Sequence, residues 1–206
     1  MCIKQNVCNP AFTLAEVLIT LGIIGVVAAM TLPTVISSYR QKEAAARLKK
    51  FNTTMAQVLI LSENENGVVN TWDMSLKPED FVRKYFGPYI KALRIDSADE
   101  DRNQGRIYFA DGSTVSIKKG RCMDLTFDIN GGRKPNQLGY DQFMFLACDK
   151  TITEWCSNKG WCTYYKPAME QSRQARLNQC KSIPSYCTGL LEYDNWEFKD
   201  DYPYKL

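Results

Sequence analysis

The chain has 206 residues, a formal net charge of +3 and no histidine. Beside an N-terminal membrane segment, this length leaves room for one globular domain of ordinary size. The lack of histidine excludes a histidine-based triad, and the sequence has no G-x-S-x-G elbow, phosphate-binding glycine-rich loop or paired-carboxylate motif. The composition therefore predicts a protein that is not an enzyme.

The most informative segment lies near the N-terminus, where residues 10–33 read PAFTLAEVLITLGIIGVVAAMTLP. About twenty apolar residues suffice for a helix that crosses a hydrocarbon core of roughly 30 Å. The run contains one charged residue, Glu16. A carboxylate inside a membrane-spanning helix costs on the order of a few kcal/mol of free energy. The presence of Glu16 in this run therefore indicates that the charge has a function.

The stretch FTLAEVLITLGIIGVVAAMTLP resembles the N-terminal segment of type IV pilins and type II secretion pseudopilins, with a small residue before Phe12 and a glutamate at the fifth place. The resemblance implies that a prepilin peptidase cleaves between Ala11 and Phe12 and methylates the new amine of Phe12. Ala11 stands where the family usually has glycine. The implied organisation is a leader (1–11), a transmembrane or filament-core helix (12–33), an amphipathic continuation of that helix (34–66) and an exported globular head (67–206).

Glu16 and Pro33 are the residues that the resemblance assigns to assembly. In a filament core of apolar helices, the Glu16 carboxylate can pair with the freed amine of Phe12 from a neighbouring subunit. Buried ion pairs add little net stability, so this pair is interpreted as setting the axial register. Pro33 removes a backbone donor inside the helix and favours a kink or local opening, and the resemblance suggests unwinding there on assembly.

Two other interpretations of the N-terminus stay open. A secretory signal would use residues 17–27 as its apolar core, be cut after Ala29 and release a soluble protein from Met30. The positive charge expected in such a signal is absent, because Lys4 is offset by Glu16. Alternatively, the same helix tethers an exported adhesin or binding module.

The segment after the apolar run is basic. Five cations stand against Glu43 here, namely Arg40, Lys42, Arg47, Lys49 and Lys50. The positive-inside rule applied to this flank would place the following domain in the cytoplasm, in conflict with the exported head that the pilin resemblance implies.

Helical periodicity resumes after Pro33. Apolar and small residues step by three and four along one stripe, at Ala44, Leu48, Phe51, Met55, Val58 or Leu59, and Ser62. The stripe predicts a helix that packs on the head and ends between Asn64 and Gly67. Residues 71–98 are predicted to be irregular or short helical, with a helix over Pro78–Tyr85.

Four segments predict strands. RIYFA (106–110) and STVSIK (113–118) flank Asp111-Gly112, which predicts a hairpin with a type I′ turn. MDLTFDI (123–129) and QFMFLA (142–147) predict two further strands. Together with the long helix they predict an α+β fold of pilin-like arrangement, with a small antiparallel sheet over about residues 105–148.

The loop between the last two strands, DINGGRKPNQLGYDQF (128–143), resembles a D-x-N-G…P-N…G-x-D-x-F loop of some pseudopilin-like proteins. Asp128, Asn130 and Asp141 offer oxygen ligands to a hard cation such as Ca²⁺. The same residue types are common in turns closed by side chain to backbone hydrogen bonds. Ca²⁺ is the one cofactor that the sequence suggests.

Residues 149–206 form a tail rich in cysteine and aromatic residues, with a predicted short helix over 167–181. Aromatic residues beside disulfides usually cover a small core; the alternative is an exposed adhesive or subunit-contact surface. Beyond the leader the chain has six cysteines, at Cys122, Cys148, Cys156, Cys162, Cys180 and Cys187. The even number predicts three disulfides formed in an oxidising compartment, with fifteen possible pairings, and therefore an exported head. Zinc is disfavoured because C-x-x-C spacings and histidine are absent.

The sequence thus predicts a structural subunit of a type IV pilus-like or type II secretion pseudopilus filament. Its expected partners are the membrane, a prepilin peptidase and other pilin or pseudopilin subunits. The precursor is expected in the cytoplasmic (inner) membrane, and the assembled filament at the cell surface or in the periplasm. Two small basic patches, Arg133-Lys134 and Lys118, Lys119 and Arg121, are too few to predict a nucleic-acid partner.

Overall fold

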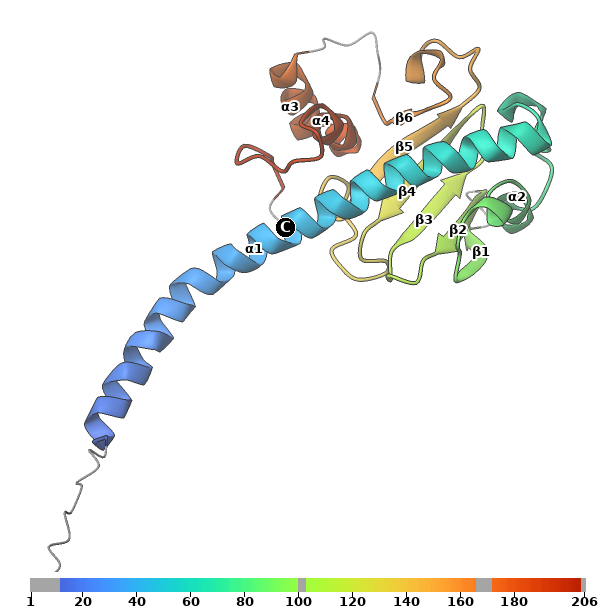
Figure 1. The fold of residues 1–206 in the computed structure, drawn as a ribbon. Coiled ribbons are helices and arrows are strands. Elements are labelled where there is room, and N and C mark those ends of the chain that lie inside the picture. The colour runs from blue at the N-terminus through green and yellow to red at the C-terminus, as the bar shows by residue number, and fades with distance from the viewer. Residues whose placement is uncertain (1–11, 100–102, 166–171, 205–206) are drawn as a thin grey trace, which may run out of the picture. The chain divides into compact units, whose positions relative to one another are not determined.

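The computed structural model describes residues 12–99, 103–165 and 172–204. The chain forms two compact units, one ending at Tyr39 and one extending from Arg40 to Leu206. The helices and strands (Figure 1) are α1 (Leu14–Asn66), α2 (Pro78–Tyr85), β1 (Arg94–Asp99), β2 (Gln104–Tyr108), β3 (Thr114–Lys118), β4 (Cys122–Asp128), β5 (Gln142–Cys148), β6 (Trp161–Thr163), α3 (Arg173–Ser182) and α4 (Cys187–Tyr193). The predicted α+β class is confirmed, as are the end of the long helix and the bounds of α2.

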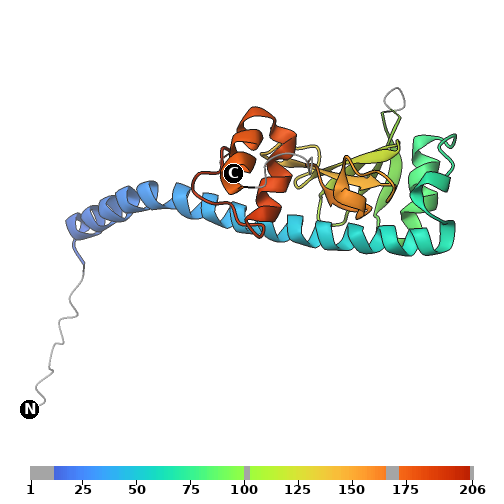
Figure 2. The same ribbon diagram turned by 90° about the horizontal axis from the view of Figure 1, so that it is seen from above.

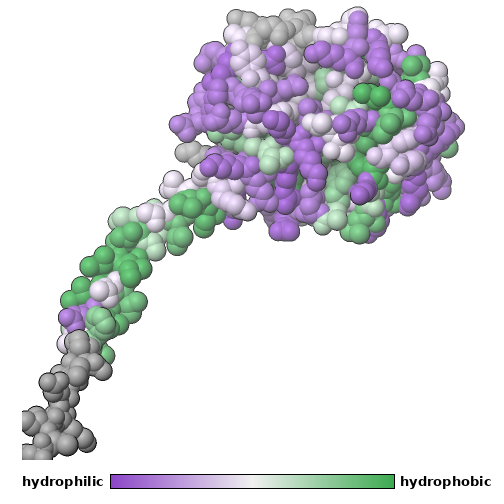
Figure 3. Space-filling view, viewed as in Figure 1, coloured by the Kyte–Doolittle hydropathy of each residue, from purple (hydrophilic) through white to green (hydrophobic). Residues whose placement is uncertain are grey.

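The N-terminal unit contains the first part of α1, and its large apolar side chains are exposed. Phe12 is 87% exposed and Leu14 80%, and Figure 3 shows hydrophobic residues over the visible side of this segment. By length and composition α1 can cross a membrane, although a signal sequence passes the same test. The helix continues through Pro33, and unwinding there on assembly stays a prediction.

Within the head unit, α1 buries one stripe of side chains against the sheet. The buried residues of α1 are Ala44, Leu48, Phe51, Met55, Val58, Leu59 and Ser62, which confirms the predicted stripe. The Phe51 ring stacks on Phe127 of β4, with centroids 4.0 Å apart, and meets Phe145 of β5 at 5.0 Å. Figure 2 shows this part of α1 running along one face of the sheet.

Over the described residues the sheet has six strands in the order β1-β2-β3-β4-β5-β6, all paired antiparallel. Successive side chains of a strand point to opposite faces, and in β4 this alternation buries Met123, Leu125 and Phe127. The register sets Leu125 opposite Phe145 and Phe127 opposite Phe143. The paired strands therefore present a continuous apolar surface to α1.

The sheet is wider than the predicted span of about residues 105–148. β1 begins inside residues 71–98, which were expected to be irregular or helical, and β6 lies beyond the last predicted strand. β1 reads RIDSAD and is paired along its length with β2. Gly105 of β2 lets α2 approach this edge, because a Cβ there would lie 2.6 Å from the Pro78 carbonyl oxygen and from a methyl of Val82.

The hairpin between β2 and β3 is confirmed, but the prediction of a type I′ turn is wrong. Gly112 has a φ of 83°, whereas Asp111 lacks the positive φ that a type I′ turn requires. The Phe109 N–H donates to Ser113 O at 3.0 Å and the Gly112 N–H to Phe109 O at 3.1 Å. The result is a three-residue loop ending in a left-handed glycine. The Asp111 carboxylate holds this loop by accepting from the N–H and hydroxyl of Ser113 at 3.0 and 2.6 Å.

The prediction of three disulfides is confirmed for the described cysteines. Cys122 pairs with Cys148, Cys156 with Cys162, and Cys180 with Cys187. Cys122 and Cys148 are also directly opposed in the β4–β5 register.

The tail packs on the sheet through α4, and α3 packs on α4. The helix predicted over 167–181 is found as α3, at Arg173–Ser182; residues 166–171 lie outside the described part of the chain. Four tail aromatics are buried, namely Tyr165, Tyr186, Trp196 and Tyr202. These residues cover the core, as expected for aromatics beside disulfides, while Tyr193 is 52% exposed.

Candidate functional site

Glu16, the charge within the apolar run, caps the start of α1. Its Oε2 accepts hydrogen bonds from the backbone N–H of Thr13 at 2.9 Å and from the Thr13 hydroxyl at 2.8 Å. The Glu16 N–H donates to Thr13 Oγ1 at 3.2 Å. This T-x-x-E capping box satisfies donors that a helix start leaves without intrahelical partners. The spacing of Thr13 and Glu16 is the recognised sequence signature of this motif, which was not predicted above.

The carboxylate of Glu16 therefore has a local partner before any subunit contact is made. Phe12, whose amine is its predicted partner in a filament, is described and exposed. Ala11, the predicted residue before the cleavage, lies outside the described residues. Cleavage at this bond would free the Phe12 amine one residue before Thr13 and so place a new cation beside the capping box.

The structure brings together the three predicted oxygen ligands of the β4–β5 loop. The Asp141 carboxylate accepts from the Asn136 N–H at 2.9 Å, the Gln137 N–H at 2.6 Å and the Asn130 side-chain amide at 3.0 Å. Asp128 accepts from the Asn130 N–H at 3.1 Å. Asp141 is 1% exposed, so it acts as a buried hub that folds the loop through its own hydrogen bonds.

Burial and like charge act on the carboxyl groups of this loop. Burial raises the pKa of the Asp128 carboxyl above its ordinary value, and the nearby charge of Asp141 acts in the same direction. Hydrogen bonds from Gln142 and Asn130 partly offset this effect. Among the described residues, no group of three or more Asp, Glu or Cys side chains is arranged to hold a metal ion. A cation here would have two carboxylates and amide or carbonyl oxygens as ligands, and Ca²⁺ binding stays a prediction.

Replacing Asp141 by alanine is expected to lower the free energy of unfolding by about 3 kcal/mol, because the change removes three hydrogen bonds to a buried carboxylate. Chemical denaturation of the full chain in neutral detergent measures the loss. Asp200→Ala, at an exposed aspartate, is the control and should change stability by less than about 0.5 kcal/mol.

A chelator tests the ion separately. If the hydrogen bonds alone hold the loop, EDTA leaves the melting temperature of the wild-type protein unchanged. A fall in melting temperature that added Ca²⁺ reverses would instead support a calcium site. An unchanged stability of the Asp141→Ala protein would contradict the role of Asp141 as the hub.

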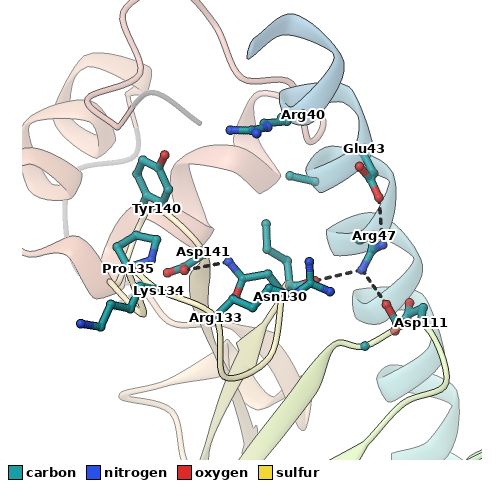
Figure 4. Close-up of a pocket in the computed structure, with 13 residues that line it drawn as sticks. Arg40, Glu43, Arg47, Asp111, Asn130, Arg133, Lys134, Pro135, Tyr140 and Asp141 are labelled. Atoms are coloured by element: carbon teal, nitrogen blue, oxygen red, sulfur yellow. Dashed lines mark hydrogen bonds and ion pairs between the residues drawn. The ribbon is translucent and has the colours of Figure 1, made fainter. Parts of the chain in front are cut away.

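A pocket of about 370 Å³ lies beside this loop in the head unit, and we name it the Arg40 pocket (Figure 4). It is bounded by the α1 residues 40–47, the β2–β3 turn and the β4–β5 loop. Arg47 joins these three elements: its Nη1 donates to the carbonyl oxygens of Ile129 at 2.9 Å and Asp111 at 3.3 Å, and its Nη2 pairs with Glu43 at 2.8 Å. From the sequence, Arg47 was predicted only as part of the basic flank, because no motif links residues so far apart in the chain.

The fold and the N-terminal unit define an α+β protein with one long helix able to cross a membrane and a disulfide-bonded head. Residues 34–206 match one family model, described as a family of unknown function (DUF6613). The match spans most of the chain, so the protein belongs to this family. No curated protein matches the chain, and no solved structure matches it. The match begins at Thr34 and so does not include the apolar run that resembles pilins.

Proposed function

We propose that this protein is a structural subunit of a type IV pilus-like or type II secretion pseudopilus filament. The observation that carries the proposal is the exposed apolar start of α1 with Glu16 as its one charge, on a helix whose later part packs on an antiparallel sheet. An isolated membrane tether has no need of that carboxylate, which costs free energy in lipid. A filament gives it a partner, the amine freed at Phe12 of a neighbouring subunit.

The disulfides support the export of the head. The three disulfides within the described residues fit an oxidising compartment, because the cytosol of most organisms keeps cysteine side chains in the reduced thiol form. The proposed protein is made as a precursor in the cytoplasmic membrane, is cut at Ala11 by a prepilin peptidase and has its head outside. It acts by assembly and not by catalysis.

The test is the intact mass and N-terminal sequence of the protein from membranes of its native host, with and without reduction. We expect a chain that begins at methylated Phe12 and gains six hydrogens on reduction of its three disulfides. A start at Met30 would mean a secreted soluble protein and overturn the filament proposal. An uncut Met1 would favour a binding module held by a plain membrane tether.

A further inference from the structure

The lining of the Arg40 pocket includes cationic side chains that form no ion pair with a carboxylate of the described residues. Its lining includes Arg40, Arg47, Arg133 and Lys134, together with Glu43, Asp111 and Asp141. Arg47 is engaged by Glu43 and two carbonyl oxygens. Within the described part of the chain, no carboxylate lies within ion-pair distance of Arg40, Arg133 or Lys134.

The carboxylates of the pocket, in contrast, are already satisfied. Glu43 pairs with Arg47 at 2.8 Å, and Asp111 accepts two hydrogen bonds from Ser113. Asp141 accepts three hydrogen bonds from the β4–β5 loop. These acids keep their charge, but the four cations of the lining outnumber the three carboxylates and leave a net charge of +1 that favours an anion from solution.

The geometry suits an anion with several oxygens. Figure 4 shows Arg40 extending from α1 over the pocket in the direction of Tyr140, whose hydroxyl is a further donor. The side chain of Arg133 passes close to Gly112, with one guanidinium nitrogen 4.0 Å from the position of a Cβ on that glycine. Guanidinium groups bind phosphate oxygens in pairs, and about 370 Å³ is ample for one phosphate group.

The position of Arg40 in the chain indicates where a phosphate would come from. The last exposed aliphatic residue of the apolar segment is Ile36, and the four helical residues from there to Arg40 rise about 6 Å along α1. The headgroup layer of a bilayer extends roughly 5–8 Å beyond the hydrocarbon core. If the segment is anchored in a membrane, Arg40 lies within reach of lipid phosphates.

We infer that the Arg40 pocket binds the phosphate of an anionic membrane lipid through Arg40 and Arg133, at the outer side of the membrane. The lipid source rests on the membrane anchoring in the proposed function, but not on filament assembly. The site also gives one cation of the basic flank, Arg40, a role on the outer side of the membrane, where the positive-inside rule does not expect it.

The test is calorimetric titration of the full chain in neutral maltoside micelles with three probes. These are dihexanoyl-phosphatidylglycerol, dihexanoyl-phosphatidylcholine and inorganic phosphate. We expect phosphatidylglycerol to bind tighter than the other two. The double substitution Arg40→Gln and Arg133→Gln should weaken its binding at least about tenfold, because it removes two charge-assisted contacts.

The matched control removes two exposed charges outside the pocket, Lys49→Gln and Lys77→Gln, and should leave the affinity unchanged. Equal losses in the two double variants, or no binding of phosphatidylglycerol or phosphate, would overturn the site. Phosphate binding without preference for phosphatidylglycerol would overturn the lipid source and leave a site for free phosphate. Glu16→Ala should bind the lipid like the wild type, so a failure of filament assembly does not alter this result.

Discussion

Replacing Glu16 by alanine is expected to remove the protein from filaments while the head stays folded. In the proposed assembly, the Phe12 amine of one subunit would lie without a counter-charge among apolar helices, and breaking a buried pair costs about 3–5 kcal/mol. Glu16 lies in the N-terminal unit, apart from the head core, so the disulfides and the sheet should form normally. Incorporation is measured by immunoblot of filaments sheared or extracted from the native host.

A second variant at Glu16 separates a role in helix capping from a role in an ion pair. Glu16→Gln keeps a side-chain oxygen for the Thr13 N–H and hydroxyl but removes the charge. If assembly needs the ion pair, the glutamine variant fails like the alanine variant. If Glu16 only caps the helix, glutamine assembles and alanine is impaired by the loss of a cap, about 1 kcal/mol. Wild-type assembly of both variants would contradict a role for Glu16 and favour a plain tether.

The second large effect is expected in the core. Phe51→Ala should lower the free energy of unfolding by about 3–5 kcal/mol, because it removes a buried ring and leaves a cavity. The Phe51 ring is 5% exposed, stacks on Phe127 and contacts Phe145, Phe109 and Trp161. It therefore links α1 to β4, β5, β6 and the β2–β3 turn.

Urea denaturation of the full chain in neutral detergent, followed by tryptophan fluorescence, measures this loss. Phe51→Leu should cost less than Phe51→Ala, because it keeps an apolar side chain in the site. Gln57→Ala on the exposed side of α1 should stay within about 0.5 kcal/mol of the wild type. A Phe51→Ala protein as stable as this control would mean that other contacts hold the helix to the sheet.

Much of the fold could be predicted because its elements have strong local signals. The stripe from Ala44 to Ser62 follows the helical period, and the buried residues of α1 are those of the stripe. The strands around Asp111-Gly112 carry apolar residues at alternate positions, and the structure buries Ile107 of β2 and Val115 and Ile117 of β3. The even number of cysteines beyond the leader predicted three disulfides, although only the fold could choose the pairs.

The missed elements depend on partners distant in sequence. Arg94–Asp99 is rich in polar residues that disfavour strands when considered alone, and its strand is defined by pairing with β2. Trp161–Thr163 is too short to give a periodic signal and is defined by pairing with β5. The Asp111-Gly112 turn departs from the prediction because Asp111 binds Ser113 through its side chain.

Of the two candidate sites in the head, the one on a single loop could be predicted from the sequence and the one built from distant segments could not. Asp128, Asn130 and Asp141 lie on one loop, so their proximity could be predicted, but the hydrogen bonds that occupy Asp141 could not. The Arg40 pocket joins α1 to two loops that follow it by some 70 to 100 positions. No local pattern marks such a site, because it exists only once the helix lies on the sheet.

The positions of the disulfides have a mechanical consequence. All three pairs lie between Cys122 and Cys187, and residues 14–66 contain no cysteine. A tensile load entering through α1 would therefore reach the sheet without crossing a disulfide, through the packing of Phe51, the hydrogen bonds of Arg47 and the backbone that follows Asn66. Oxidation crosslinks β4 to β5 and closes two short loops of the tail, whereas none of the three disulfides joins α1 to the sheet.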